Sequence, residues 1–205
     1  MKILNLKKNK LFDVSKKNIT YVITRADSIG GAQIHVRDIS LYAIQNGFKV
    51  TIITGGAGNF FDSLKKYGIK VIKIKSLCRD LNLINDLLTL YKLCKVIKKI
   101  KPFIISVHSS KAGALVRICA AMSFKFPSII FTAHGWSFAE GKTFISVFLS
   151  SFVERFLACF TKKIITVCET DYKRGLKYKI CRKNKLVCIH NGMPFYPKKI
   201  KEINE

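Results

Sequence analysis

Short runs of β-branched residues alternate along the chain with longer segments in which apolar residues recur at helical spacing. Runs of this kind are typical of buried strands, and their regular alternation with helical segments predicts repeated βα units. The expected strands are residues 19–24, 49–54, 70–74, 103–107, 128–133, 163–167 and 185–189. The pattern therefore predicts an α/β fold with a doubly wound, mostly parallel, Rossmann-like sheet of about seven strands, the first strand lying near its centre.

The helical segments each present one apolar stripe that we expect to pack on the sheet. The stripes consist of Ala32, Val36, Ile39 and Ala43 in one helix, and of Leu83, Leu87, Leu90, Cys94 and Ile97 in another. Residues 144–160 form the most apolar helical segment, but it is too short to span a bilayer and contains Glu154 and Arg155.

The chain has 205 residues and 49% hydrophobic composition, which suits one α/β domain with a substantial core. We place this domain at residues 19–193. Residues 1–18 form a basic N-terminal extension without the apolar segment of a secretory signal.

Lys and Arg outnumber Asp and Glu by 37 to 12, giving a formal net charge of +25. Such a surface attracts polyanions, so nucleic acid, phosphate-bearing ligands and an anionic membrane are the partner classes to weigh. Basic clusters fall at Lys92, Lys95, Lys98, Lys99 and Lys101, and at Arg155, Lys162 and Lys163. No nucleic-acid recognition motif accompanies the charge, so nucleic acid is not expected as a partner.

The seven cysteines show no zinc-type spacing, so we expect free, buried thiols in a cytoplasmic protein.

Two loops that follow predicted strands carry residues suited to binding an anion. Gly30 and Gly31 open a helix directly after the first strand, where backbone amides and the helix dipole favour an anion. A tight strand-to-helix turn is the structural alternative. After the fourth strand, Ser109, Ser110 and Lys111 place hydroxyls and an ammonium at a helix start, although Ser110 equally suits a plain N-cap. Neither a G-x-G-x-x-G fingerprint nor a P-loop is present.

The remaining loops offer a histidine, a carboxylate and a turn. His134 follows the fifth strand beside Gly135 and the single tryptophan, Trp136, which favours a functional role for the imidazole. Glu169 follows the sixth strand and also suits helix capping. Asn191-Gly192 follows the seventh strand and is first of all a turn.

The order and spacing of these loops resemble the group 1 (GT4-like) glycosyltransferases of capsule, exopolysaccharide and O-antigen synthesis. The matching segments are RADSIGGAQ (25–33), TIITGG (51–56), HSSKAG (108–113), FTAHGW (131–136), IITVCE (164–169) and IHNG (189–192). Cys168 stands where members of that family usually have serine. The resemblance covers nearly the whole chain and implies the N-terminal half of a GT-B enzyme, which is metal-independent, needs no further cofactor and transfers sugar from a nucleotide donor with retention.

By this resemblance His134 bonds the donor sugar, and Gly30, Gly31 and Gln33 lie near the donor phosphates. The residues expected to line the acceptor side or cleft are Arg25, Ser109, Ser110, Lys111, Trp136 and Glu169. Asn191 and Gly192 mark the passage to a second domain, and the resemblance implies that residues 194–205 are the truncated start of an interdomain linker.

The sequence ends at Glu205, before the donor-binding domain that such enzymes carry, so transfer by this chain alone is not expected. The expected partners are a nucleotide sugar, a lipid-linked saccharide acceptor, a donor-domain subunit and the inner face of the cytoplasmic membrane. A truncated gene product, a split-enzyme subunit and a non-catalytic acceptor-binding or membrane-binding module remain alternatives.

Overall fold

The computed structural model of the chain describes residues 17–123, 126–138 and 141–192. Within them, parallel strands alternate with helices throughout. The elements are β1 (Asn18–Ile23), α1 (Gly31–Gln45), β2 (Lys49–Thr54), α2 (Asn59–Lys66), β3 (Lys70–Lys73), α3 (Leu83–Ile100), β4 (Ile104–Val107), α4 (Ser110–Ala121), β5 (Ser128–Ala133), α5 (Phe144–Ala158), β6 (Lys163–Thr166), α6 (Glu169–Lys177), η2 (Lys183–Lys185) and β7 (Leu186–Cys188). Residues 1–16 of the predicted extension and the predicted linker lie outside the described residues.

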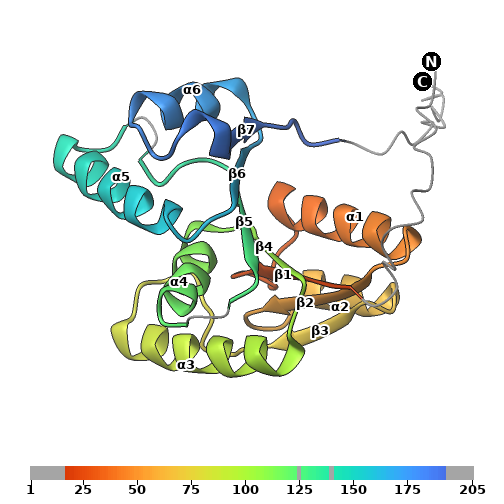
Figure 1. Cartoon of the computed structure of the whole chain (residues 1–205). Helices are drawn as coiled ribbons and strands as arrows, with labels where there is room; N and C mark the ends of the chain where they lie inside the picture. The colour runs from red at the N-terminus through yellow and green to blue at the C-terminus, as the bar shows by residue number, and fades with distance from the viewer. Residues whose placement is uncertain (1–16, 124–125, 139–140, 193–205) are drawn as a thin grey trace, which may run out of the picture.

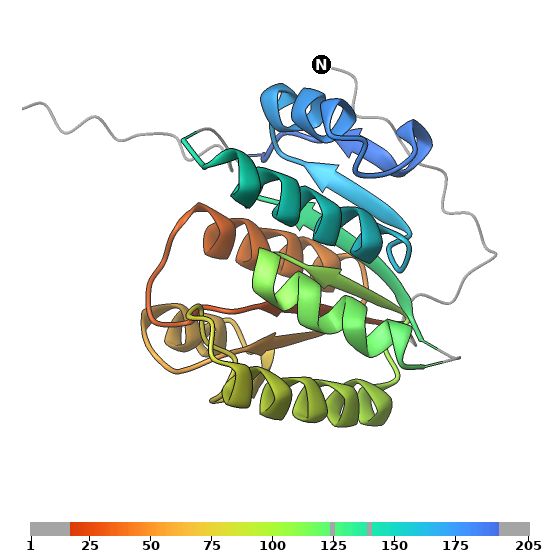
Figure 2. The same ribbon diagram turned by 90° about the vertical axis from the view of Figure 1, so that its left-hand side faces the viewer.

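The strands form one parallel sheet in the order β3-β2-β1-β4-β5-β6-β7. From β1 the chain steps outward to β2 and β3, then returns and steps the other way from β4 to β7. Right-handed crossovers in opposite directions place their helices on opposite faces of a sheet. Accordingly α1 lies on one face, whereas α3, α4, α5 and α6 cover the other (Figures 1 and 2).

This doubly wound topology confirms the predicted fold class. Each predicted strand is present with shifts of no more than two residues at its ends, and β1 is third in the sheet, beside the central strand β4. The switch in winding direction falls between β1 and β4, where a crevice opens at the carboxyl ends of the strands.

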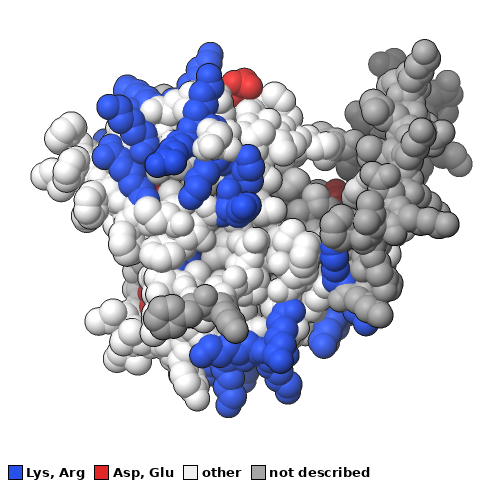
Figure 3. Space-filling view, viewed as in Figure 1, with Lys and Arg blue, Asp and Glu red and all other residues white. Residues whose placement is uncertain are grey.

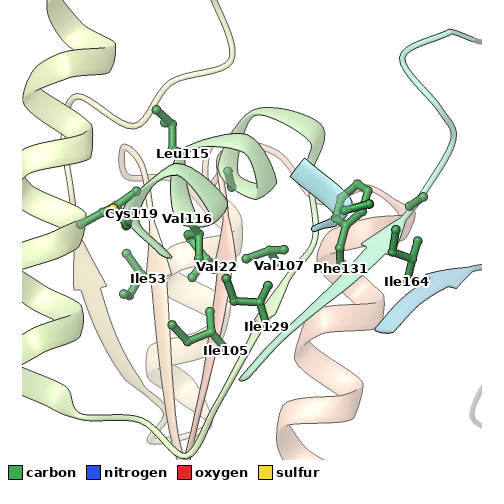
Figure 4. Packing of buried hydrophobic residues seen from close by; sticks show 14 of the residues in the cluster. Val22, Ile53, Ile105, Val107, Leu115, Val116, Cys119, Ile129, Phe131 and Ile164 are labelled. Carbon is green, nitrogen blue, oxygen red and sulfur yellow. The ribbon is translucent and has the colours of Figure 1, made fainter. Parts of the chain in front are cut away.

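The core has two parts, one for each face of the sheet. Under the four helices, β-branched residues such as Val22, Ile105 and Ile129 pack against Val116 of α4 (Figure 4). Under α1 and α2, the buried residues include Tyr21, Ile23, Val36, Ile52 and Phe60. Strands buried on both faces explain why their sequences show few polar interruptions.

The apolar stripe predicted for α3 is wrong at its N-terminal end. Leu83 and Leu87 are 77% and 58% exposed, whereas Thr89, Leu93 and Ile97 are buried. Thr89 is accommodated because its hydroxyl donates to the Asn85 carbonyl at 2.7 Å and contacts the Ser76 hydroxyl at 2.8 Å.

The expectation of free thiols holds for all seven cysteines, but only Cys119 is fully buried.

A buried ion pair joins α4 to α5. The Arg117 guanidinium donates to both carboxylate oxygens of Glu154 at 2.9 and 3.2 Å, and its Nε donates to the Gly113 carbonyl. The same guanidinium lies 4.3 Å from the centre of the Phe131 ring. Because the Arg117 side chain is fully buried, these contacts replace the solvation that both charges have lost.

We expect Glu154→Ala to lower the free energy of unfolding by about 3–5 kcal/mol, because it leaves the Arg117 charge buried without its counter-ion. Urea denaturation measures this change. Asp27→Asn, which breaks the exposed Arg25–Asp27 pair, is the control and should have a much smaller effect. Equal losses in the two variants would contradict a stabilising role for the buried pair.

Candidate functional site

A pocket of about 350 Å³ lies at the carboxyl ends of β1, β4 and β5, at the switch in winding direction. Its lining includes six residues that the sequence nominated: Arg25, Gln33, Ser109, Ser110, Lys111 and His134. They come from loops up to about a hundred positions apart and meet because parallel strands all end at the same edge. The structure therefore brings these residues together, while their individual roles remain predictions.

The N-terminus of α1 forms one side of this edge. Gly30 is the N-cap, and its amide donates to the Gln33 Oε1 atom at 3.2 Å. A glycine N-cap has no side chain with which to satisfy the first-turn amides, so these donors stay available to a ligand. At Gly31 no atom outside its chain neighbours and the backbone of its own helix lies within 4 Å of the place that a Cβ would occupy, so the approach to the helix start is open.

Three imidazoles gather beside the pocket, and two of them, His108 and His134, line it. His108 Nδ1 lies 3.2 Å from His134 Nε2, and His108 Nε2 lies 2.8 Å from the Ser106 hydroxyl. The His35 ring of α1 lies 5.3 Å from the His134 ring and 5.6 Å from the His108 ring, centre to centre. His108 is almost fully buried and lines both this pocket and a second, apolar pocket beside α1.

The surroundings keep these imidazoles neutral. Burial lowers the pKa of His134 to about 4, with a further lowering by His35. Burial also lowers the pKa of His108 well below its usual value, and His134 and His35 add to this effect. The pKa of His35 is also lowered, because the effect of burial is larger than the opposing effect of Asp38. Near neutral pH each ring therefore has one N–H donor and one lone pair.

The hydrogen bonds that join Ser106, His108 and His134 allow two tautomeric arrangements. In one, His108 donates to His134 and accepts from Ser106, which leaves His134 with an N–H at Nδ1. In the other, His134 donates to His108, which donates to Ser106, and His134 Nδ1 becomes an acceptor. Either arrangement leaves Nδ1 of His134 without a hydrogen-bond partner among the described residues, so it can bond a ligand hydroxyl.

The serine-lysine loop is arranged differently from the prediction. Ser109, not Ser110, is the N-cap of α4, and its Oγ accepts from the Ala112 amide at 3.3 Å. Lys111 pairs with Asp86 at 2.6 Å and also donates to the Asp80 carbonyl. Its ammonium is therefore held against α3 and contributes a partly compensated positive charge to the pocket.

Other nominated residues lie outside the pocket. Trp136 is buried, donates from Nε1 to the Asp171 carbonyl at 2.8 Å and stacks on Phe138, which are the contacts of a core residue. Glu169 is exposed in the first turn of α6. Asn191 and Gly192 are exposed beyond β7 at the end of the described chain.

Sequence reasoning missed His35, His108 and Arg79 as site residues. His108 is the first residue after β4, and His134 is the first residue after β5. These two strands are neighbours in the sheet. That parallel placement was the available signal for His108. His35 lies one helical turn after Gly31, but only the tertiary contact of α1 reveals its proximity to the other rings.

The three imidazoles also bring one nitrogen each within 4.8 Å of one another, a donor set that suits a transition metal such as zinc. Two of the three rings already share a hydrogen bond of ordinary length, so the geometry is explained without an ion. We assign no metal to this cluster.

The sheet and its switch-point pocket define a class of fold, a Rossmann-like domain of the kind found in GT-B proteins. HepE from Anabaena in complex with UDP has this fold, with a TM-score of 0.67 and 15% identity over 86% of this chain and 44% of that chain. Residues 29–194 match the model of Glycosyltransferase Family 4, and the chain belongs to this family.

Curated relatives come from polysaccharide synthesis. A galactosyltransferase of Escherichia coli, named for transfer from UDP-Gal to GlcNAc-diphosphoundecaprenol, is 30% identical over 71% of this chain. WbnH of Escherichia coli, an O-antigen biosynthesis glycosyltransferase, is 28% identical over 89% of this chain. The chain spans only 37% and 51% of the lengths of these two relatives.

We expect the stability of the domain to fall as the pH is lowered from about 6.5 to about 4. The unfolded chain protonates His134 near pH 6.5, whereas the folded chain resists until about 4, so the unfolded state binds more protons in this window. Thermal unfolding at several pH values should show a shallower slope for His134→Gln. An unchanged slope in His134→Gln would refute the assignment.

Proposed function

We propose that this domain is the acceptor-side half of a retaining, nucleotide-sugar-dependent glycosyltransferase of cell-surface polysaccharide synthesis. The observation that carries the proposal is the pocket at the switch point, where a neutral histidine, an open helix N-terminus and a serine-lysine loop converge in a member of Glycosyltransferase Family 4. The names of the relatives support a nucleotide-sugar donor and a lipid-linked acceptor.

The pocket offers groups suited to the charges that develop in such a reaction. When the bond between the sugar and the nucleotide diphosphate breaks, negative charge accumulates on the departing phosphate. The N-terminus of α1, together with Arg25 and Arg79, provides a positive environment for that charge. His134, held through Nε2 by His108, is left with Nδ1 to orient a sugar hydroxyl.

This half supplies one wall of a cleft. We propose that a donor-side domain provides the other wall, joined to residues 19–193 through the Asn191-Gly192 turn or carried by a separate subunit. Preorganised contacts on both sides of the reacting sugar are needed to lower the barrier, so the described domain by itself should be inactive. The proposed location is the inner face of the cytoplasmic membrane, where a lipid-linked acceptor would be met.

A second candidate is a non-catalytic subunit that binds acceptor or membrane within a polysaccharide-synthesis complex. It is favoured by the ion pair of Lys111 with Asp86 and by its hydrogen bond to the Asp80 carbonyl. Both contacts leave this lysine less free to bind a donor phosphate. This candidate predicts acceptor binding without transfer even when a donor-side domain is present.

For the test, we expect no transfer from a UDP-sugar to GlcNAc-diphosphoundecaprenol by the chain alone, and transfer once a matching donor-side domain is supplied. In the pair, His134→Ala should reduce the rate by about 100-fold or more, since a preorganised donor or acceptor at the reacting sugar is lost. Radiolabelled sugar incorporation into lipid measures both effects.

The exposed His190, replaced by alanine, is the matched control and should leave the rate of the pair unchanged. Transfer by the purified chain alone would overturn the need for a second half. A wild-type rate in the His134→Ala pair would remove only the assigned role of this histidine.

A further inference from the structure

Helix α5 has its apolar side facing outward. Its buried positions include Ser151, Glu154, Leu157 and Ala158. Its exposed positions include six large apolar side chains, with exposed fractions from 58% to 84%: Phe144, Ile145, Phe148, Leu149, Phe152 and Phe156. The four phenylalanines among them recur every four residues, so they form one row along the helix.

The first half of α3 adds a second apolar row. Leu83, Ile84, Leu87 and Tyr91 are between 58% and 79% exposed. A groove of about 420 Å³ between α3, α4 and α5 is lined by Leu81 at one side and by Leu149 and Val153 at the other. The exposed row of α5, the exposed row of α3 and the groove are hereafter called the α3–α5 apolar surface, and exposed apolar area of this extent is typical of interaction sites.

Basic residues border this surface on two sides. Lys95, Lys98 and Lys99 are exposed along the second half of α3, beyond the apolar row. On the other side of α5, Lys142, Lys173 and Lys177 line a hollow together with Val147. Figure 3 shows that the Lys and Arg side chains of this face include one group over α6 and another along α3 at its lower edge.

Acidic groups at the groove are neutralised by ion pairs. The lining of the groove includes Asp86 and Glu154. Asp86 pairs with Lys111, and Glu154 pairs with Arg117. Neither carboxylate therefore presents an uncompensated negative charge to an approaching anionic surface.

We propose that the α3–α5 apolar surface docks this domain on an anionic lipid bilayer, with its phenylalanines and leucines inserted among the lipids and the bordering lysines on the headgroups. An apolar helix face flanked by lysines is the arrangement that binds membrane interfaces. The proposal rests on the proposed function, because a lipid-linked acceptor is met in a bilayer. Among the described helices, none has the length and hydropathy to cross a membrane, so attachment by these helices would be interfacial.

The position of the surface connects the bilayer with the candidate site. Ser110 and Lys111 line both the switch-point pocket and the groove of the α3–α5 apolar surface. An acceptor whose lipid stays in the bilayer under α3 and α5 would therefore present its head group beside the pocket. A binding mode based on lysines alone, as the sequence had indicated, provides no such placement.

The test is sedimentation of the chain with phosphatidylcholine vesicles that contain a minority of phosphatidylglycerol and no acceptor. Phe148→Ser with Phe152→Ser should weaken binding about tenfold or more, because two exposed phenylalanines lose their apolar contact with lipid. The control is Tyr42→Ser with Tyr67→Ser, which removes aromatic residues of similar exposure outside α3 and α5 and should bind as wild type. Circular dichroism checks that both variants are folded.

The salt dependence of binding distinguishes insertion of apolar side chains into the bilayer from electrostatic binding by lysines alone. At about 1 M salt, where the Debye length is about 3 Å, the wild-type chain should stay measurably bound, whereas the Phe148/Phe152 variant should be released. Equal binding of the two variants, or complete release of the wild-type chain by salt, would overturn the proposal.

A protein partner for the same surface would give another result. If light scattering showed a stable dimer that the Phe148/Phe152 variant disperses, and the wild-type chain ignored vesicles, a second copy would be the occupant and the proposal would fail. Because these vesicles carry no acceptor and no transfer is measured, membrane docking and the proposed function can fail independently.

Discussion

All seven strands run parallel, and this constraint governs what the remaining parts of the domain can do. Each strand must be followed by a crossover, and each crossover begins at the same edge of the sheet. His108 and His134, which are 26 positions apart, come within hydrogen-bond distance because they follow β4 and β5, which are neighbours in the sheet. The reversal of winding between β1 and β4 then opens a crevice beside these rings, and the N-terminus of α1 closes its other side.

The buried Arg117–Glu154 pair contributes to how α5 is turned. Glu154 points inward to meet the guanidinium, and it shares the buried side of α5 with Ser151, Leu157 and Ala158. The phenylalanines one helical turn apart are thereby directed outward, where they would be costly in an isolated soluble domain. A buried ion pair and an exposed apolar row are thus two consequences of one helix rotation. In the proposal made above, the bilayer covers the row that this rotation exposes.

The imidazole cluster shows how burial can prepare a site for uncharged hydrogen bonding. In a chain with a net charge of +25, a cluster of protonated histidines would add to an already repulsive charge. Burial instead depresses the pKa of each ring, and proximity to the other rings adds to this effect at His108 and His134, so the cluster is neutral near pH 7. The phosphate of a donor would then be stabilised by helix amides and arginines, and the histidine would be reserved for hydroxyl groups.

The sequence by itself determined the order of strands and helices, because β-branched runs and helical periods are local properties of the chain. It also nominated Arg25, Gln33, Ser109, Ser110, Lys111 and His134, since residues after strands in such a sheet share one edge. Only the tertiary structure showed that His35 and His108 lie beside His134, that Trp136 belongs to the core, and that Lys111 forms an ion pair with Asp86. Only the tertiary structure, likewise, turned Leu83, Leu87 and the phenylalanines of α5 outward. Periodicity reveals that a helix has an apolar side, but the direction of that side depends on which distant residue, such as Arg117, the opposite side must meet.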